Sequence, residues 1–326
     1  MDKTKQYRQN SIKNIAWPAD FAAGGHVVDF IEKGNVEKMK VKLKTYLHHP
    51  GSLVVLLLTI LSAVITVLAL GSLIVYILVK GVPHLTPELF AWTYNSDNVS
   101  MLPALINTLL LTLLAIVVAG PLGIFAAIYM VEYAKKGNKI VGLVRVTAET
   151  LSGIPSIVYG LFGMLFFCTA LHMGYSLISG ALTVAIMVLP TIMRTSEEAL
   201  LAVPRSYREG SFGLGAGKLR TVFKAVLPSA VPGILSGVIL SIGRIVGETA
   251  ALIFTAGTVA AVPKVNAGIK GFFGSSVRTL SVHMYNLSKE GLHTDQAFAT
   301  AVVLLIFVIV INFISNILAN KLKSKV

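Results

Sequence analysis

Charged residues are scarce in this chain, and cysteine is almost absent. Only 13% of the 326 residues are charged, whereas 55% are hydrophobic. A soluble domain of this size needs a larger charged fraction to stay dissolved, so the composition excludes an ordinary soluble fold and indicates a membrane protein. Cys168 is the only cysteine, which excludes a disulfide within the chain.

Acidic residues are also few, and the basic residues are unevenly placed. The 28 Lys and Arg residues outnumber 15 Asp and Glu residues, and 22 of the 28 lie before residue 51, in 132–147, in 193–228 or after residue 320. Such clustering in alternate loops is typical of a polytopic protein whose basic loops face the cytosol. Nucleic-acid binding would place basic residues among exposed aromatic residues on one face, and no segment has that pattern.

The first fifty residues lack both an apolar core and a small-residue cleavage site, so they do not have the pattern of a signal peptide. We expect residues 1–50 to form a basic cytosolic extension and residues 51–326 to form the membrane domain.

Six stretches are apolar enough to cross a bilayer, which takes about 20 residues in a helix. They are 53–79, 102–130, 150–171, 177–193, 230–254 and 298–318. The sequence therefore predicts an all-α polytopic membrane protein with six transmembrane helices and both termini in the cytosol, since all four basic stretches then share one side. Residues 256–273 are apolar enough to be re-entrant, and that question stays open.

The long loop 194–228 joins the fourth and fifth predicted spans on the cytosolic side. Ser206 and Glu209 have the spacing of a capping box, which predicts a short helix. Glycines at 213, 215 and 217 should end that helix before a second short basic helix leads to Pro228. An ordinary amphipathic loop and a docking element for a soluble partner both fit this pattern.

The segment Glu209–Gly215, followed by Leu227-Pro228, resembles the Glu-Ala-Ala loop of binding-protein-dependent ABC importer permeases. Gly210 and Ser211 stand where that loop has its two alanines. Four other stretches resemble more narrowly the PstA type, the A-type permease of phosphate importers; they are 107–110, 154–160, 189–195 and 243–250. The resemblance covers roughly residue 102 to the end.

This resemblance implies a transport subunit in the cell's cytoplasmic (inner) membrane that moves inorganic phosphate inward and has no catalytic site of its own. It implies no cofactor in this chain, with ATP and Mg bound by a partner ATPase dimer, and it implies a second permease and an extracytoplasmic phosphate-binding protein. The implied ATPase-coupling residues are Glu209, Gly210, Ser211, Gly215, Leu227 and Pro228. A permease for sulfate or molybdate is an alternative, as is a membrane enzyme acting on lipid phosphates.

Arg244 and Glu248 are ionisable residues inside the fifth predicted span. Such residues cost several kcal/mol unless they are paired or face water or protein, so they are candidates for the substrate pathway. Their spacing of four would let them pair on one helix face, and a purely structural ion pair remains the other interpretation. Four glycines are expected to form a small face for helix packing: Gly233, Gly237, Gly243 and Gly247.

Other signals for chemistry are weak. Gly217-Lys218 resembles the end of a phosphate-binding loop, but residue 212 is Phe and residue 219 is Leu, so the chain lacks the pattern of an ATP site. The histidines do not have metal-ligand spacing, and no metal site is expected. Glu132 and Glu149 lie near inner ends of predicted helices, where we expect interfacial positions.

Overall fold

The computed structural model describes residues 50–135, 137–264, 266 and 268–323, and every regular element among them is a helix. The predicted all-α class is therefore confirmed. The expected N-terminal extension lies outside the described residues except for Pro50. The chain divides into two units, residues 1–73 and 74–326.

The helix α3 (Pro50–Gly81) contains the predicted span 53–79. It begins in the first unit and ends in the second. Most of its described apolar side chains are exposed, and none of its most apolar window is buried. A helix that is apolar all round suits a lipid environment.

The second unit holds the remaining helices. In chain order they are η1 (Val82–His84), η2 (Pro87–Phe90), α4 (Leu102–Ile128), η3 (Tyr129–Tyr133), α5 (Lys139–Ser152), α6 (Ser156–Gly163), η4 (Met164–Ala170), α7 (Leu177–Ala202), α8 (Arg205–Gly213), α9 (Lys218–Thr221), η5 (Val222–Val226), α10 (Leu227–Val246), α11 (Ala250–Ile253), α12 (Gly268–Gly274), α13 (Leu280–Glu290) and α14 (Thr294–Lys323).

The helix α7 is the centre of this unit. Of its apolar window 67% is buried, against 33% for the α4 span and 22% for the α14 span. Small residues bring the neighbouring segments, α4 and the turn after α11, close to it. A Cβ on Gly123 of α4 would lie 2.9 Å from Ile192, and one on Gly180 of α7 would lie 2.7 Å from Ala256. Backbones approach closely at such positions, as is usual between membrane helices.

Five helices are long and apolar enough to cross a membrane, and a bent pair brings the number to six. That pair joins α5 to α6 and η4 with a bend of 104° at residues 153–155. Pro155 lacks an N–H and disfavours helical backbone at Ile154, so the helix breaks there. Residues 150–152 of the span predicted at 150–171 therefore belong to α5, on the other side of the bend.

Two other predicted boundaries also differ from the structure. The span predicted to end at residue 193 continues as α7 to Ala202, because its polar last turns are paired with neighbouring side chains. The span predicted to reach residue 254 ends at Val246, where Gly247 caps α10, and α11 begins after the break. Among the described residues of 256–273, the α-helical segment is part of the seven-residue α12, which is too short to cross a bilayer.

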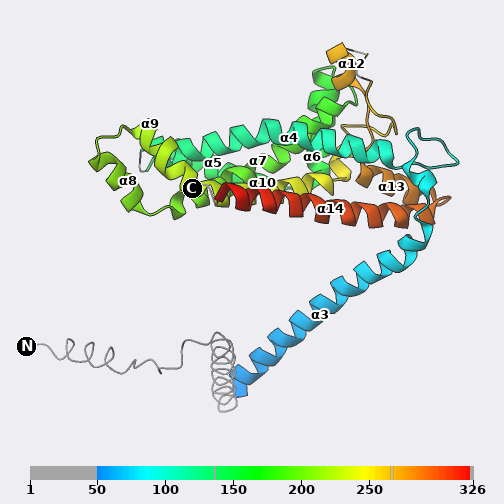
Figure 1. Ribbon diagram of the computed structural model, residues 1–326, viewed down its shortest axis with the longest axis horizontal. Helices are drawn as coiled ribbons and strands as arrows, with labels where there is room; N and C mark the ends of the chain where they lie inside the picture. The colour runs from blue at the N-terminus through cyan, green and yellow to red at the C-terminus, as the bar shows by residue number, and fades with distance from the viewer. Residues whose placement is uncertain (1–49, 136, 265, 267, 324–326) are drawn as a thin grey trace, which may run out of the picture. The chain divides into compact units, whose positions relative to one another are not determined.

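Figure 1 shows α8 and α9 at one end of the second unit, with the C-terminal end of α14 beside them, and α12 and α13 at the other end. Basic residues of the loop and the tail therefore share one end, as expected for a cytosolic face.

At the opposite end, His283 on α13 is completely buried. Its Nε2 lies 3.2 Å from the carbonyl oxygen of Val99, and its Nδ1 lies 3.4 Å from Nη1 of Arg278. A neutral ring that donates from Nε2 and accepts at Nδ1 satisfies both contacts. Burial, assisted by the Arg278 charge and opposed by the Val99 hydrogen bond, lowers the pKa of His283 from 6.5 to about 4.

Candidate functional site

The inner loop folds as the predicted pair of short helices. The first, α8, begins at Arg205 after Pro204, so Pro204 takes the cap position that we expected for Ser206. It ends at Gly213, and Gly215 then has φ +81°, a left-handed conformation that glycine adopts without strain. The second helix, α9, starts directly after Gly217.

The expected coupling residues spread along this loop and the start of α10. Glu209, Gly210 and Gly215 are exposed. Ser211 bonds to the hydroxyl of Thr221 at 2.8 Å, which ties α8 to α9. Leu227 and Pro228 are half-buried in the first turn of α10.

Large apolar side chains also lie exposed in the same loop, and sequence reasoning did not single them out. They are Tyr207, Phe212, Leu214, Leu219 and Phe223. Leu214 is 91% exposed in the turn between the helices. Several exposed apolar residues in one short segment are typical of a surface that binds another protein.

Arg208 points from α8 toward the membrane helices. Its Nε and Nη2 donate to Oε1 of Glu132 at 3.0 and 2.6 Å. Its Nη1 donates to the carbonyl of Val203 at 2.9 Å, and Nη2 also donates to that of Leu200 at 3.0 Å. The Arg208 and Glu132 side chains are only 19% and 8% exposed. Glu132, expected at the interface, is therefore half of a largely buried ion pair between elements far apart in sequence.

Arg244 lies in the last turn of α10 and faces a groove of about 740 Å³. The groove is lined by Thr191, Ser236, Ile239, Leu240, Gly243, Arg244, Val308, Asn312 and Asn316. Most of its polar groups are therefore amides and hydroxyls on α7, α10 and α14. In the part of the chain that the structure describes, no carboxylate lies within 4.0 Å of the Arg244 guanidinium.

Glu248 does not pair with Arg244, and that prediction is wrong. The i, i+4 relation requires a continuous helix, but α10 ends at Val246. The carboxylate of Glu248 instead accepts a hydrogen bond from the backbone N–H of Ala251 at 3.0 Å, at the start of α11. Its backbone carbonyl accepts one from the Ser281 hydroxyl at 2.5 Å. Glu248 is 8% exposed and holds the break between the two helices.

The four glycines expected to pack helices fall into two pairs. A Cβ on Gly233 would lie 2.6 Å from Cβ of Ala199, and one on Gly237 would overlap Thr195, so both meet α7 closely. A Cβ on Gly243 would find its nearest neighbour, Oδ1 of Asn312, at 3.9 Å, and one on Gly247 would find only the Gly243 carbonyl at 3.7 Å. The second pair therefore has room for a side chain.

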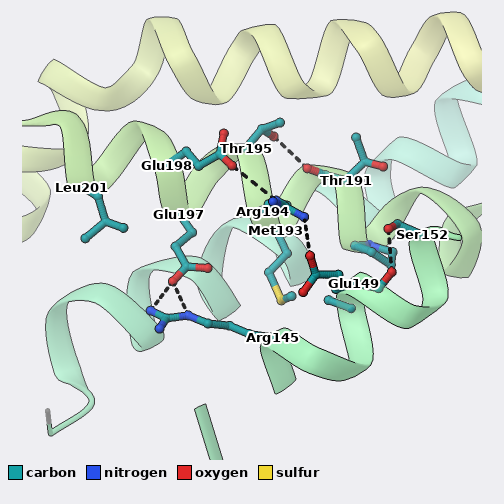
Figure 2. Close-up of a pocket in the computed structure, with 12 residues that line it drawn as sticks. Arg145, Glu149, Ser152, Thr191, Met193, Arg194, Thr195, Glu197, Glu198 and Leu201 are labelled. Atoms are coloured by element: carbon teal, nitrogen blue, oxygen red, sulfur yellow. Dashed lines mark hydrogen bonds and ion pairs between the residues drawn. The ribbon is translucent and has the colours of Figure 1, made fainter. Parts of the chain in front are cut away.

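A second polar cavity, of about 530 Å³, lies between α5 and the last turns of α7 (Figure 2). Arg145 pairs with Glu197 across it, with Nε 2.7 Å from the carboxylate. Arg194 lies between two carboxylates, 3.3 Å from Glu198 and 3.6 Å from Glu149. Only the i, i+4 spacing of Arg194 and Glu198 could have indicated this cluster from the sequence.

Comparison with known proteins shows the family to which this chain belongs. Residues 119–326 match the family described as binding-protein-dependent transport system inner membrane component. The chain belongs to this family. The probable ABC transporter permease protein YqgI of Bacillus subtilis is 34% identical over 279 residues, which cover 81% of this chain and 94% of that protein. Phosphate transport system permease protein PstA 1 of Mycobacterium tuberculosis H37Rv is 40% identical over 154 residues, 47% of this chain and 49% of that protein.

Solved structures share the permease's fold. A bacterial alginate ABC transporter gives a TM-score of 0.61 at 15% identity, over 82% of this chain and 95% of that chain. The MetNI methionine ABC transporter gives 0.53 at 20% identity, over 68% of this chain and 93% of that chain. At such identities the likeness concerns the fold alone.

Family membership fixes the broad role. The permease is a multi-pass inner-membrane subunit of an ABC importer, and it works with ATPase subunits and a periplasmic binding protein. It is a non-catalytic transport subunit without a cofactor of its own, since ATP is bound by the ATPase. A membrane enzyme acting on lipid phosphates is thereby excluded.

Proposed function

We propose that this permease passes inorganic phosphate into the cell and that Arg244 binds the anion in transit. The observation that carries the proposal is the groove itself. There a guanidinium with no carboxylate partner among the described residues faces amide and hydroxyl groups inside membrane spans. Arg244 lies in the span Lys218–Val246, and Asn312 and Asn316 lie in the span Thr294–Ile317.

The polar side chains of the groove, Arg244 above all, lie within membrane spans and need polar surroundings. An arginine that faced lipid would cost several kcal/mol, so the groove is expected to face water or another protein. A second permease seated over this side would enclose the groove and complete a path between the two subunits. We therefore propose a second permease as the partner at this face.

The chemistry of the groove suits phosphate. A guanidinium keeps its charge and offers forked donors that match phosphate oxygens. At neutral pH phosphate retains at least one P–O–H group, which can donate a hydrogen bond to the amide oxygen of Asn312 or Asn316, whereas sulfate has no O–H to donate. Sites that satisfy a substrate's hydrogen-bond donor discriminate against an analogue that lacks it. Amides and hydroxyls also bind weakly enough to allow release, which conduction requires.

The relatives support phosphate as the substrate. Besides PstA 1, the phosphate transport system permease protein PstA homolog of Mycoplasma pneumoniae is 34% identical over 226 residues, 66% of this chain and 33% of that protein. We further propose that the loop from α8 to the start of α10 docks the ATPase, with Glu209, Gly215 and the exposed apolar side chains at the contact.

The test is uptake by the complex purified in mild detergent with its partners and reconstituted in vesicles. Arg244→Gln should assemble and hydrolyse ATP but lose phosphate uptake. A hydrogen bond to a charged group contributes about 1.5–3 kcal/mol, which corresponds to about 10–150-fold in rate. Arg244→Lys keeps the charge but loses the fork, so its uptake should be intermediate.

Lys270→Gln, which removes one exposed positive charge outside the groove, is the matched control and should transport normally. Uptake by Arg244→Gln within twofold of the parent would refute the pathway role. Sulfate or molybdate that is transported as well as phosphate would instead favour the alternative of a permease for another oxyanion.

A further inference from the structure

Few side chains attach α8 to the rest of the permease. None of its nine residues is buried. Among the described residues, its side-chain hydrogen bonds to other elements come from Ser211 and Arg208. The Ser211 bond goes to Thr221 on α9, within the same loop. In that part of the chain, Arg208 is therefore the residue that joins α8 by side-chain hydrogen bonds to the membrane helices.

The groups that Arg208 contacts belong to two different helices. Glu132 lies in η3, the wide π-helical turn that ends the α4 helix at its inner end. Leu200 and Val203 lie at the inner end of α7, and their carbonyls have no further helical partner there. Wide helical turns are often found at functional sites, where a helix can change its path.

The chemistry of the contact makes it a firm connection. One guanidinium makes four hydrogen bonds in a fixed fork, two to a carboxylate and two to backbone carbonyls. Removal of one partner would leave a charge largely buried and unpaired, which is strongly unfavourable. Lysine could keep the attraction to Glu132 but could not hold both carbonyls at once. The side chain can therefore move only together with α8, η3 and the end of α7.

We propose that Arg208 is a positioning residue that transmits movement of α8 to α4 and α7, with Glu132 as its anchor. The inference rests on the proposed docking of the ATPase on α8. It assigns the coupling step to a contact within this chain, distinct from the residues that touch the ATPase.

The experiment compares Arg208→Gln, Arg208→Lys and Glu132→Gln in the reconstituted complex. Lys139→Gln, which removes an exposed charge at the start of α5, is the control. In both Gln variants the ATPase should still co-purify, while stimulation of hydrolysis by the loaded binding protein and phosphate uptake should fall about tenfold. Arg208→Lys should be intermediate, because it keeps the ion pair but loses contacts with α7.

A second readout separates transmission from simple stability. In a Cys168→Ala background, Val131→Cys places a half-buried thiol in η3. Its labelling rate should change when ATP and vanadate are added to the parent and to Lys139→Gln. The change should vanish in Arg208→Gln although the ATPase remains bound.

The outcomes are distinct. Stimulation and uptake within twofold of the parent in both Gln variants would overturn the coupling role and leave docking intact. If Arg208→Gln fails to assemble, Glu132→Gln decides, since it leaves the surface of α8 unchanged. Loss of the ATPase from Glu132→Gln as well would overturn the proposal, because the pair would then serve folding or docking. Failure of the docking proposal would be recognised separately. The ATPase would then remain bound to a variant with an altered loop surface, such as Gly215→Trp.

Discussion

Substitution of Gly237 by alanine should loosen the contact between α10 and α7. The added Cβ would overlap Oγ1 of Thr195 and lie 2.7 Å from its Cβ. Rotation of the Thr195 side chain could move Oγ1, at the cost of its 2.8 Å hydrogen bond to the Thr191 carbonyl. It could not move Cβ, so the helices must separate by about 0.7 Å to bring 2.7 Å to an ordinary contact of 3.4 Å.

The magnitude follows from a comparison within the same helix. Overpacking of this kind destabilises a protein by about 1–3 kcal/mol. Replacement of glycine by alanine in a helix interior has the opposite effect and stabilises the helix by up to about 1 kcal/mol. Gly243→Ala receives only the second effect, because its Cβ would meet nothing nearer than 3.9 Å. The free energy of unfolding of Gly237→Ala should therefore be about 1–3 kcal/mol lower than that of Gly243→Ala.

Unfolding of the purified permease in mixed micelles with a rising SDS fraction measures this difference, and a thermal midpoint in mild detergent checks its sign. Thr195→Gly added to Gly237→Ala removes the opposing Cβ and should recover part of the loss. Gly237→Ala that is at least as stable as Gly243→Ala would refute the close packing.

Two further predictions concern the two ends of the bundle. Gly215→Trp puts a bulky side chain into open space at a left-handed backbone position; insertion should persist while the ATPase no longer co-purifies, and retention of the ATPase would contradict the docking role of the loop. At the other end, His283 stays neutral when folded, so the unfolded chain binds the extra proton between pH 6.5 and about 4. Stability from this group is present above pH 6.5 and is lost as the pH falls. The loss should reach about 2 kcal/mol at pH 5, and a thermal midpoint that falls equally in the parent and in His283→Gln would contradict it.

The number and approximate position of the spans could be predicted because long apolar runs are a strong signal. The errors came where polar or helix-breaking residues alter a run. Hydropathy falls at Arg194, yet α7 continues to Ala202 because Glu197 is paired with Arg145. That partner lies 52 residues away and has no mark in the local sequence. A helix break near Pro155 follows from the sequence, but the 104° bend depends on how the two pieces pack.

The candidate site was found in part for similar reasons. Arg244 stood out because a charge inside an apolar run is rare. Arg208 and Glu132 did not, since each lies in a polar segment and 76 residues separate them. The apolar residues of the loop were also missed, because Leu214 in a sequence resembles any core leucine until its exposure of 91% is known.

The break after Val246 places the Arg244 guanidinium near the C-terminal end of a helix. A helix ends there, and Arg244 occupies its last turn, where the negative end of the helix dipole lies. A cation in this position is stabilised by about 0.3–1 kcal/mol at exposed sites and by up to about 2 kcal/mol when partly buried. A carboxylate at i+4 would have stabilised the charge more strongly, but it would have occupied the guanidinium donors. Because Gly247 ends the helix and Glu248 turns to α11, the helix dipole favours the Arg244 cation, and no carboxylate among the described residues occupies the guanidinium donors that we propose bind the anion.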